Sequence, residues 1–108
     1  MAVDELLLNL GFSPALKGFN YLSSLIALRL NDPDYKLTAA YYAVGRTFGV
    51  SWERVERCAR TALNTAIDSA GLDRFYEIFG FWSPLSGRFT VGDFVALCAH
   101  HLTKHRRP

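Results

Sequence analysis

Apolar side chains return every three or four residues along most of the chain. That spacing places them on one face of an α-helix, and no segment alternates apolar and polar residues for long enough to predict a strand. Glycines, prolines and capping residues divide the pattern into six predicted helices, which cover residues 3–10, 17–31, 37–48, 52–70, 72–79 and 90 into the tail. The stretch 81–89 contains Pro84 and Gly87 and is predicted to form a loop. The pattern therefore predicts an all-α fold, one compact domain of about six helices over residues 1–108.

Residues 41–58 carry the pattern of a helix-turn-helix, within predicted helices that together span residues 37–70. Gly45 lies inside the first helix, where the second helix has to cross closely, and Gly49 tolerates the positive φ that the turn needs. Ser51 follows as a good N-cap for the second helix. Apolar residues at suitable spacings are expected to hold both helices on the body of the domain: Val44, Phe48, Val50, Val55 and Cys58. Helices joined at a glycine are common, so a plain helical hairpin is the alternative.

The second helix of this pair has two faces of opposite character. At about 100° per residue, one face forms an apolar stripe of Val55, Cys58, Ala59, Ala62, Leu63 and Ala66. The opposite face carries Glu53, Arg54, Glu56, Arg57, Arg60, Thr61 and Asn64. Arginine pairs with guanine, glutamate accepts from the cytosine amino group, and asparagine pairs with adenine. This face therefore has the residue types that read base edges in a major groove.

A solvated helix face is the alternative interpretation of these charges. Glu53 with Arg57, and Glu56 with Arg60, are spaced i,i+4, so each ion pair would add a few tenths of a kcal/mol to helix stability. The two interpretations are compatible, because the same pairs can hold arginine side chains in place for recognition. The face has three arginines and no lysine, which favours recognition.

The distribution of charge points in the same direction. The formal net charge is only +2. Residues 1–34 hold four acids against two cations, a net of −2, and residues 35–108 hold ten cations against six acids, a net of +4. Nine of the twelve cations are arginine, whose planar fork suits phosphates and guanine edges. The C-terminal two-thirds therefore leans towards a polyanionic partner, with ordinary surface charge as the alternative.

Several short motifs together resemble one known family. They are Leu16-Lys17-Gly18-Phe19 with Tyr21-Leu22, then Phe48, then Arg54-Val55-Glu56-Arg57 with Arg60 and Ala62, then Phe79-Gly80, and finally Phe94-Val95-Ala96. From about residue 7 to residue 105 the chain is similar to the C-terminal DNA-binding effector domain of the stage-zero sporulation master regulator of endospore-forming bacteria. The most specific part of the resemblance is the stretch from Val55 to Ala62.

The resemblance implies a six-helix domain that binds promoter DNA through the second helix of its helix-turn-helix. It also implies that Glu56, Arg57 and Arg60 contact bases and phosphates. Thr61 stands where the family usually has histidine, and residues 32–42 form a shorter segment than in the family. The family's regulator carries a phosphoacceptor receiver domain ahead of this module, and none is expected in these 108 residues. The chain is then either an excised fragment of a longer regulator or a free-standing bacterial effector domain without a phosphorylation switch. The start at Met1 favours the free-standing protein as our expectation.

Composition and short motifs exclude several other classes. The N-terminus is acidic, unlike a secretory signal, and no apolar run reaches the roughly 18 residues of a membrane helix, so a cytoplasmic protein is expected. The two cysteines, Cys58 and Cys98, are too few for a disulfide scaffold and lie at apolar helical positions, where burial is expected. No phosphate loop, nucleophile elbow or paired-carboxylate motif is present, so we expect neither an enzyme nor a cofactor.

The last predicted helix ends in a basic, histidine-rich tail. His101 and His105 are spaced i,i+4, a zinc-ligand spacing, but no third ligand is fixed nearby, so metal binding is the less favoured interpretation. A basic patch is preferred, in which Lys104 touches the DNA backbone. A dense group of aromatic residues is expected to serve core and loop packing: Phe75, Tyr76, Phe79, Phe81 and Trp82.

Two functional hypotheses from different classes follow. The first is a transcription regulator that binds double-stranded DNA at promoter sites, with a weak homodimer on DNA and a contact to RNA polymerase as further expected partners. Its predicted DNA-binding residues are Ser51, Arg54, Glu56, Arg57, Arg60, Thr61, Asn64 and Lys104. Arg57 would read guanine, and Glu56 would select cytosine or orient Arg57. The second is a protein-interaction module that pairs with a full-length regulator or with RNA polymerase and does not read DNA itself.

Overall fold

A computed structural model of the chain describes residues 2–80 and 90–104. The described residues form the helices α1 (Val3–Asn9), α2 (Lys17–Asn31), α3 (Leu37–Phe48), α4 (Trp52–Ala70), α5 (Leu72–Phe79) and α6 (Val91–Lys104). The all-α fold predicted from the sequence is confirmed, and each predicted helix is present with ends that agree within a residue or two. The loop predicted over residues 81–89 lies outside the described residues.

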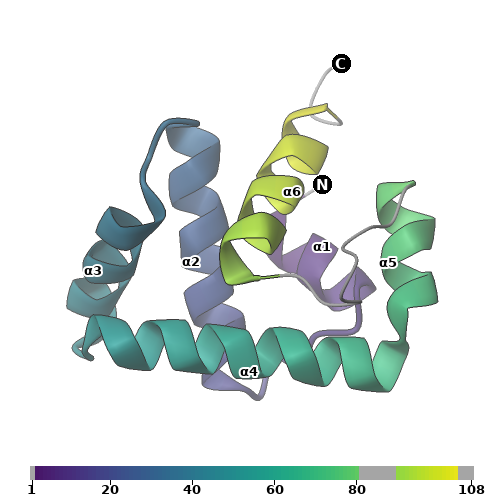
Figure 1. The fold of residues 1–108 in the computed structure, drawn as a ribbon, viewed down its shortest axis with the longest axis horizontal. Coiled ribbons are helices and arrows are strands. Elements are labelled where there is room, and N and C mark those ends of the chain that lie inside the picture. Colours follow the sequence, from purple (N-terminus) through teal and green to yellow (C-terminus); the bar gives the residue numbers. More distant parts are fainter. Residues whose placement is uncertain (1, 81–89, 105–108) are drawn as a thin grey trace.

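The hydrophobic core forms around α2, which packs against α1, α3, α4 and α6 (Figure 1). The largest side chains that are completely buried come from all six helices and the turn after α1: Leu6, Leu7, Leu10, Leu22, Leu25, Ile26, Val44, Val55, Leu63, Phe75, Phe94 and Leu102. Within the described residues, no buried side chain is polar or charged. The core therefore holds the helices together by apolar burial, which contributes roughly 25 cal/mol for each Å² removed from water.

Aromatic rings join α5 and α6 to this core. Phe75 of α5 is fully buried, with its ring 5.9 Å from that of Phe94 and 6.5 Å from that of Phe12. Phe79 is half-buried beside Phe75, whereas Tyr76 is 55% exposed. The predicted aromatic cluster thus serves packing at Phe75 and Phe79, not at Tyr76, because a helix can turn only one of its faces to the core. Phe81 and Trp82 of that cluster lie outside the described residues.

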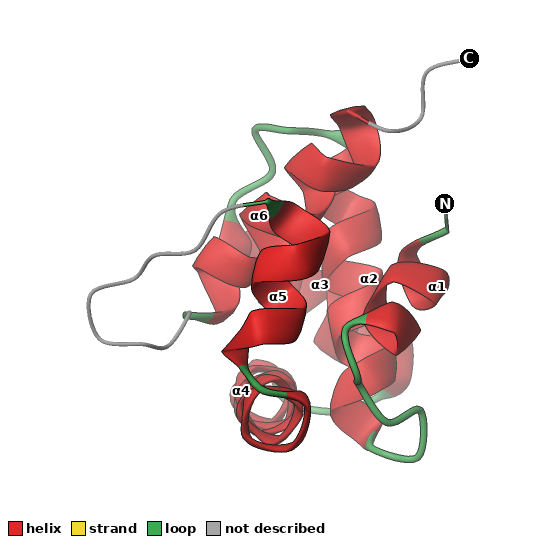
Figure 2. Cartoon of the chain, turned by 90° about the vertical axis from the view of Figure 1, so that its right-hand side faces the viewer, coloured by secondary structure: helices red, strands yellow, loops and turns green. Residues whose placement is uncertain are grey.

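The helix α4 lies across one end of the molecule. Figure 1 shows it along the base of the domain, and Figure 2 shows the same base with α4 seen end-on. The helix α6 begins near α4 and runs away from it, so that its C-terminal end lies at the opposite end of the domain. One face of α4 therefore packs on the body, and the other face is left without a covering helix.

The start of α2 crosses α4 at very short range. At Gly18, an added Cβ would collide with the backbone carbonyl oxygen of Cys58, and it would lie 2.7 Å from the Cβ of Ala62. Only a residue without a side chain allows the two backbones to approach so closely. Gly18 therefore sets the position of α4 relative to α2.

Two further glycines, Gly45 within α3 and Gly49 after it, shape the turn between α3 and α4, as predicted. Gly49 ends α3 in the left-handed conformation with φ +70°, and its N–H donates to the carbonyl of Gly45. A Cβ at Gly45 would lie 2.6 Å from the carbonyl oxygen of Val50, so the turn folds directly against α3. The predicted helix-turn-helix boundaries coincide with α3 and α4.

Three of the five apolar residues expected to hold the helix-turn-helix on the body are less buried than predicted; one of them, Val50 in the turn, is half-buried. Phe48 is 41% exposed, and its ring meets that of the buried Tyr21 edge-on, with ring centroids 5.1 Å apart. Cys58 was expected on the buried stripe and is half-buried, since it lies at the margin of that stripe beside Gly18. The prediction of burial is correct for Cys98, which is completely buried.

Two glycine substitutions separate close packing from backbone conformation. We expect Gly18→Ala to lower the free energy of unfolding by about 3 kcal/mol, the upper end for overpacking, because the obstacle is backbone that cannot rotate away. We expect Gly49→Ala to cost only about 1 kcal/mol, because the site is open and the penalty is the left-handed conformation alone. Urea unfolding monitored by circular dichroism measures both values. A Gly18→Ala variant as stable as Gly49→Ala would contradict the close crossing of α2 and α4.

Candidate nucleic-acid interface

The helix α4 begins at a well-formed N-cap. The Ser51 side-chain oxygen accepts a hydrogen bond from the backbone N–H of Arg54 at 3.2 Å, and Glu53 adds a negative charge to the first turn. A capping hydrogen bond of this kind stabilises a helix by about 1 kcal/mol, and an acidic side chain in the first turn is favourable to the helix dipole. Ser51 thus fixes where α4 starts and in which direction each following side chain leaves the helix.

The two predicted faces of α4 are both present. The inner face is buried at Val55, Ala59, Ala62, Leu63, Ala66 and Ile67. The outer face is exposed at Glu53, Arg54, Arg57, Arg60 and Thr61, with Glu56 and Asn64 half-buried at its margins. The structure therefore brings seven of the eight predicted DNA-binding residues together at the cap of α4 and along the helix as far as Asn64.

One of the two predicted ion pairs forms on this surface. An Arg60 nitrogen lies 3.1 Å from a Glu56 carboxylate oxygen, with the Arg60 side chain 56% exposed and that of Glu56 27% exposed. Among the described residues, Glu53 and Arg57 do not form the other predicted pair, because an ion pair between two solvated side chains gains too little to hold them together. Arg60 is consequently held by a carboxylate, whereas Arg57 extends from α4 without one.

Arg57 occupies the centre of the outer face. At about 100° per residue it lies about 180° around the helix from the buried Ala66. Its neighbours on the same face are Arg54 on one side and Thr61 one turn further on. Asp68 stands on this face in the C-terminal half of α4, so the cationic part of the surface is its N-terminal half.

On the side of α4 that faces α3, Tyr41 of α3 packs against the first turn of α4. Tyr41 is 6% exposed and stacks on Trp52 with ring centroids 6.5 Å apart. Burial, and next the Glu56 carboxylate, raise the pKa of Tyr41 to about 12, while Arg60 acts in the opposite direction. Tyr41 is therefore a neutral phenol at physiological pH, packed behind the Glu56–Arg60 pair.

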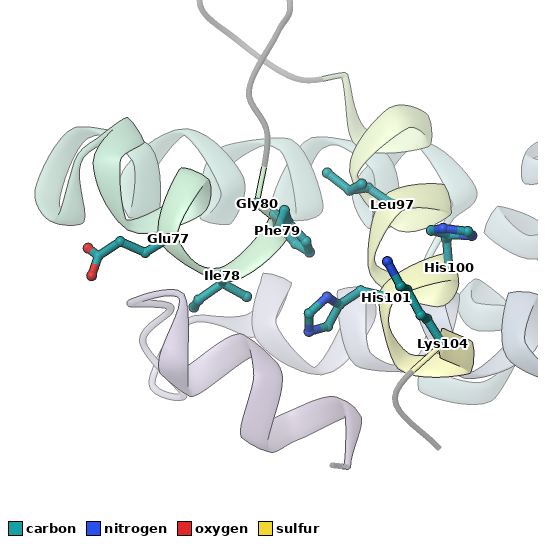
Figure 3. Close-up of a pocket in the computed structure, with 8 residues that line it drawn as sticks. All are labelled: Glu77, Ile78, Phe79, Gly80, Leu97, His100, His101 and Lys104. Atoms are coloured by element: carbon teal, nitrogen blue, oxygen red, sulfur yellow. The ribbon is translucent and has the colours of Figure 1, made fainter. Parts of the chain in front are cut away.

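Lys104 is the one predicted DNA-binding residue that lies apart from the others. Figure 3 shows it at the end of α6 with His100 and His101, opposite Ile78 and Phe79 of α5. These side chains line a cavity of about 290 Å³ between the two helices. Since α6 is about 20 Å long and leads away from α4, Lys104 and the outer face of α4 lie at opposite ends of the domain.

The histidine pair of the sequence interpretation cannot be assembled from the described residues. His101 meets Phe79 edge-on, with ring centroids 5.4 Å apart, and His105 lies outside the described residues. No three histidine, cysteine, aspartate or glutamate side chains gather as a metal site in residues 2–80 and 90–104.

Burial raises the pKa of the Cys98 thiol well above its usual range. None of the helices in the described part of the chain is long and apolar enough to cross a membrane.

Three exposed residues next to the outer face were not among the predicted site residues: Trp52, Tyr42 and Lys17. Trp52, the first residue of α4, is 38% exposed and contacts Tyr42, which is 58% exposed, at a centroid distance of 6.0 Å. Lys17, at the start of α2, shares a small cavity with Thr61. The predicted N-cap at Ser51 marks Trp52 as the first helical residue, so sequence could have identified it. Nothing local connects Lys17 to Thr61, because the fold alone brings them together.

A comparison with known protein families identifies a family whose model matches this chain. The family model described as "Sporulation initiation factor Spo0A C terminal" matches residues 3–102, which is nearly the whole chain. That family is a DNA-binding effector domain of a sporulation regulator, and it is not an enzyme family. Because the match covers the first five helices and all but the last two residues of α6, the chain belongs to the Spo0A C-terminal family of DNA-binding regulatory domains.

Proposed function

We propose that this protein binds double-stranded DNA in a sequence-specific manner, as a transcription regulator, by inserting the N-terminal half of α4 into the major groove. The observation that carries the proposal is the outer face of α4, which is uncovered and bears three arginines. A helix with its side chains is about 10–12 Å across, and the major groove of B-DNA is about 12 Å wide, so α4 matches the groove.

The positions of the seven predicted residues on α4 and at its cap suggest a role for each of them. Arg57, at the centre and without a carboxylate partner, is proposed to bind a guanine edge through two hydrogen bonds. Glu56 is paired with Arg60, so we propose that it orients Arg60 rather than Arg57. The remaining residues are proposed to contact phosphates or flanking bases: Ser51, Arg54, Thr61 and Asn64.

Lys104 could make its predicted phosphate contact only with DNA that bends. A straight duplex that lies on α4 passes the end of the domain opposite to Lys104. Lys104 would therefore reach only DNA that bends around the domain, and it is not needed for the reading of bases by α4.

A protein-interaction module is the second candidate function. Residues 45–61 carry four cations against two acids, a net charge of +2, which is low for a surface that binds DNA tightly on its own. The exposed Trp52 and Tyr42 beside α4 are residue types enriched at protein interfaces. In this function the domain would pair with a full-length regulator or with RNA polymerase.

The dependence of DNA affinity on salt separates these two functions. We expect binding to random-sequence duplexes with log K falling against log salt at about −0.9 for each phosphate contacted, so that several contacts give a slope of several units. Fluorescence anisotropy with a labelled duplex at two or more salt concentrations measures the slope. Absence of binding at low salt would support the interaction module instead.

The substitution Arg57→Ala tests the proposed reading position. We expect it to reduce the ratio of specific to nonspecific affinity by about 5- to 150-fold, because a bidentate contact to guanine discriminates by about 1–3 kcal/mol. Lys104→Ala serves as the comparison, since a residue away from α4 changes specific and nonspecific affinity by the same factor. Both side chains are exposed, so folding should persist by circular dichroism. An equal loss on both kinds of DNA for Arg57→Ala would make Arg57 a phosphate contact.

Ser51 allows the start of α4 to be tested without loss of the helix cap. Aspartate caps a helix about as well as serine, so Ser51→Asp should unfold at nearly the same urea concentration as the unsubstituted protein. Its added negative charge should weaken DNA binding by about 1 kcal/mol, roughly fivefold, if the start of α4 lies within a few Å of phosphates. Ser51→Asn, an equally good cap without charge, is the control. Equal affinities of the two variants would place the start of α4 away from DNA.

A further inference from the structure

The start of α2 forms a second surface beside the outer face of α4. We propose that the cavity between them binds one phosphate and its deoxyribose from the DNA backbone, with Lys17 and Thr61 as the polar contacts. This inference rests on the proposed function, in which α4 lies in the major groove. It adds a contact from a helix outside the helix-turn-helix.

The cavity has the chemical character that a nucleotide backbone requires. It measures about 190 Å³ and is lined by Leu16, Lys17, Gly18, Cys58, Thr61 and Ala62. Lys17 and Thr61 are exposed at its rim and offer an ammonium group and a hydroxyl to a phosphate. The remaining lining is aliphatic or sulfur-bearing and suits the carbon-rich face of a sugar. The cavity therefore combines a cation, a hydroxyl donor and an apolar wall in one place.

Its position relative to Arg57 agrees with the dimensions of DNA. Thr61 lies one turn after Arg57 on α4, and Figures 1 and 2 both show the start of α2 beside α4 at the base of the domain. A helix about 10–12 Å across fills a groove about 12 Å wide, so the sugar–phosphate backbone has to pass along the flanks of the helix. On the flank of α4 that faces α2, the surface it meets is this cavity.

The positive charge of Lys17 is isolated in the N-terminal part of the sequence. Lys17 is the one cationic side chain among residues 1–28, in a part of the chain that is otherwise acidic. Gly18, next in sequence, fixes the distance between α2 and α4, since an added Cβ would collide with Cys58. Because Gly18 is the next residue, the backbone of Lys17 is held at a fixed distance from α4. A fixed position suits a residue that sets the register of a protein on the duplex.

The charge of Lys17 gives the first test. We expect Lys17→Ala to reduce the salt slope of binding by about one unit and to lower specific and random-sequence affinity by the same factor. Lys36→Ala is the matched control, because Lys36 is an exposed lysine that precedes α3, beyond the opposite end of α2. It should leave the slope unchanged. Equal slopes for Lys17→Ala and the unsubstituted protein would overturn the proposal.

The thiol of Cys58 gives a second test inside the cavity itself. Cys58 is half-buried there, whereas Cys98 is completely buried, so iodoacetamide should alkylate Cys58 selectively. We expect a saturating random-sequence duplex to slow this alkylation at least fivefold, measured by mass spectrometry of the cysteine peptides. Alkylation at the same rate with duplex bound would overturn the backbone site while leaving the proposed function intact. A protein that binds no duplex at low salt would instead overturn the proposed function.

Discussion

The crossing of α2 over α4 at Gly18 is the contact on which the rest of the structure depends. The helix α2 also packs against α1, α3 and α6, so it is the common support of the domain. An added Cβ at Gly18 would meet the backbone of α4, so the two helices are already as close as their backbones allow. Close packing of the core therefore fixes the distance between α2 and α4. A helix held this closely along one side must present its other side outward. The exposed face of α4 is therefore a consequence of how the core is built.

The composition of α4 reflects this division. Its inner face uses three alanines, Ala59, Ala62 and Ala66, together with Val55 and Leu63, so that the body of the domain can approach its backbone. Its outer face can then carry long polar side chains, because nothing packs against them. The pairing of Glu56 with Arg60 at 3.1 Å restricts one of these side chains before any partner arrives. Restricting it in advance lowers the entropy that binding would otherwise have to offset.

Local signals predicted the helices and their caps, because the cap at Ser51 and the left-handed glycine at Gly49 depend only on neighbouring residues. The two faces of α4 followed from periodicity for the same reason. What sequence could not provide was distance between segments. Gly18 meets the backbone of Cys58 although 40 positions separate the two residues, and Lys104 lies apart from α4 because α6 runs away from α4 towards the other end of the domain. Lys17, 44 positions before Thr61 in the sequence, becomes its neighbour only in the folded chain.

The modest net charge of the proposed interface bears on how it would discriminate between sequences. Phosphate contacts act on every sequence alike, so a surface that is strongly cationic binds all DNA tightly. Residues 45–61 carry a net charge of only +2, and Glu56 neutralises part of the arginine charge. At the proposed interface we therefore expect nonspecific affinity to be weak and the proposed contacts around Arg57 to make up a larger share of specific binding. Such an interface depends more on the exact position of the protein along the duplex, its register, than on its net charge. In the backbone site that we propose, Lys17, next to the close crossing at Gly18, would set that register through a single phosphate contact.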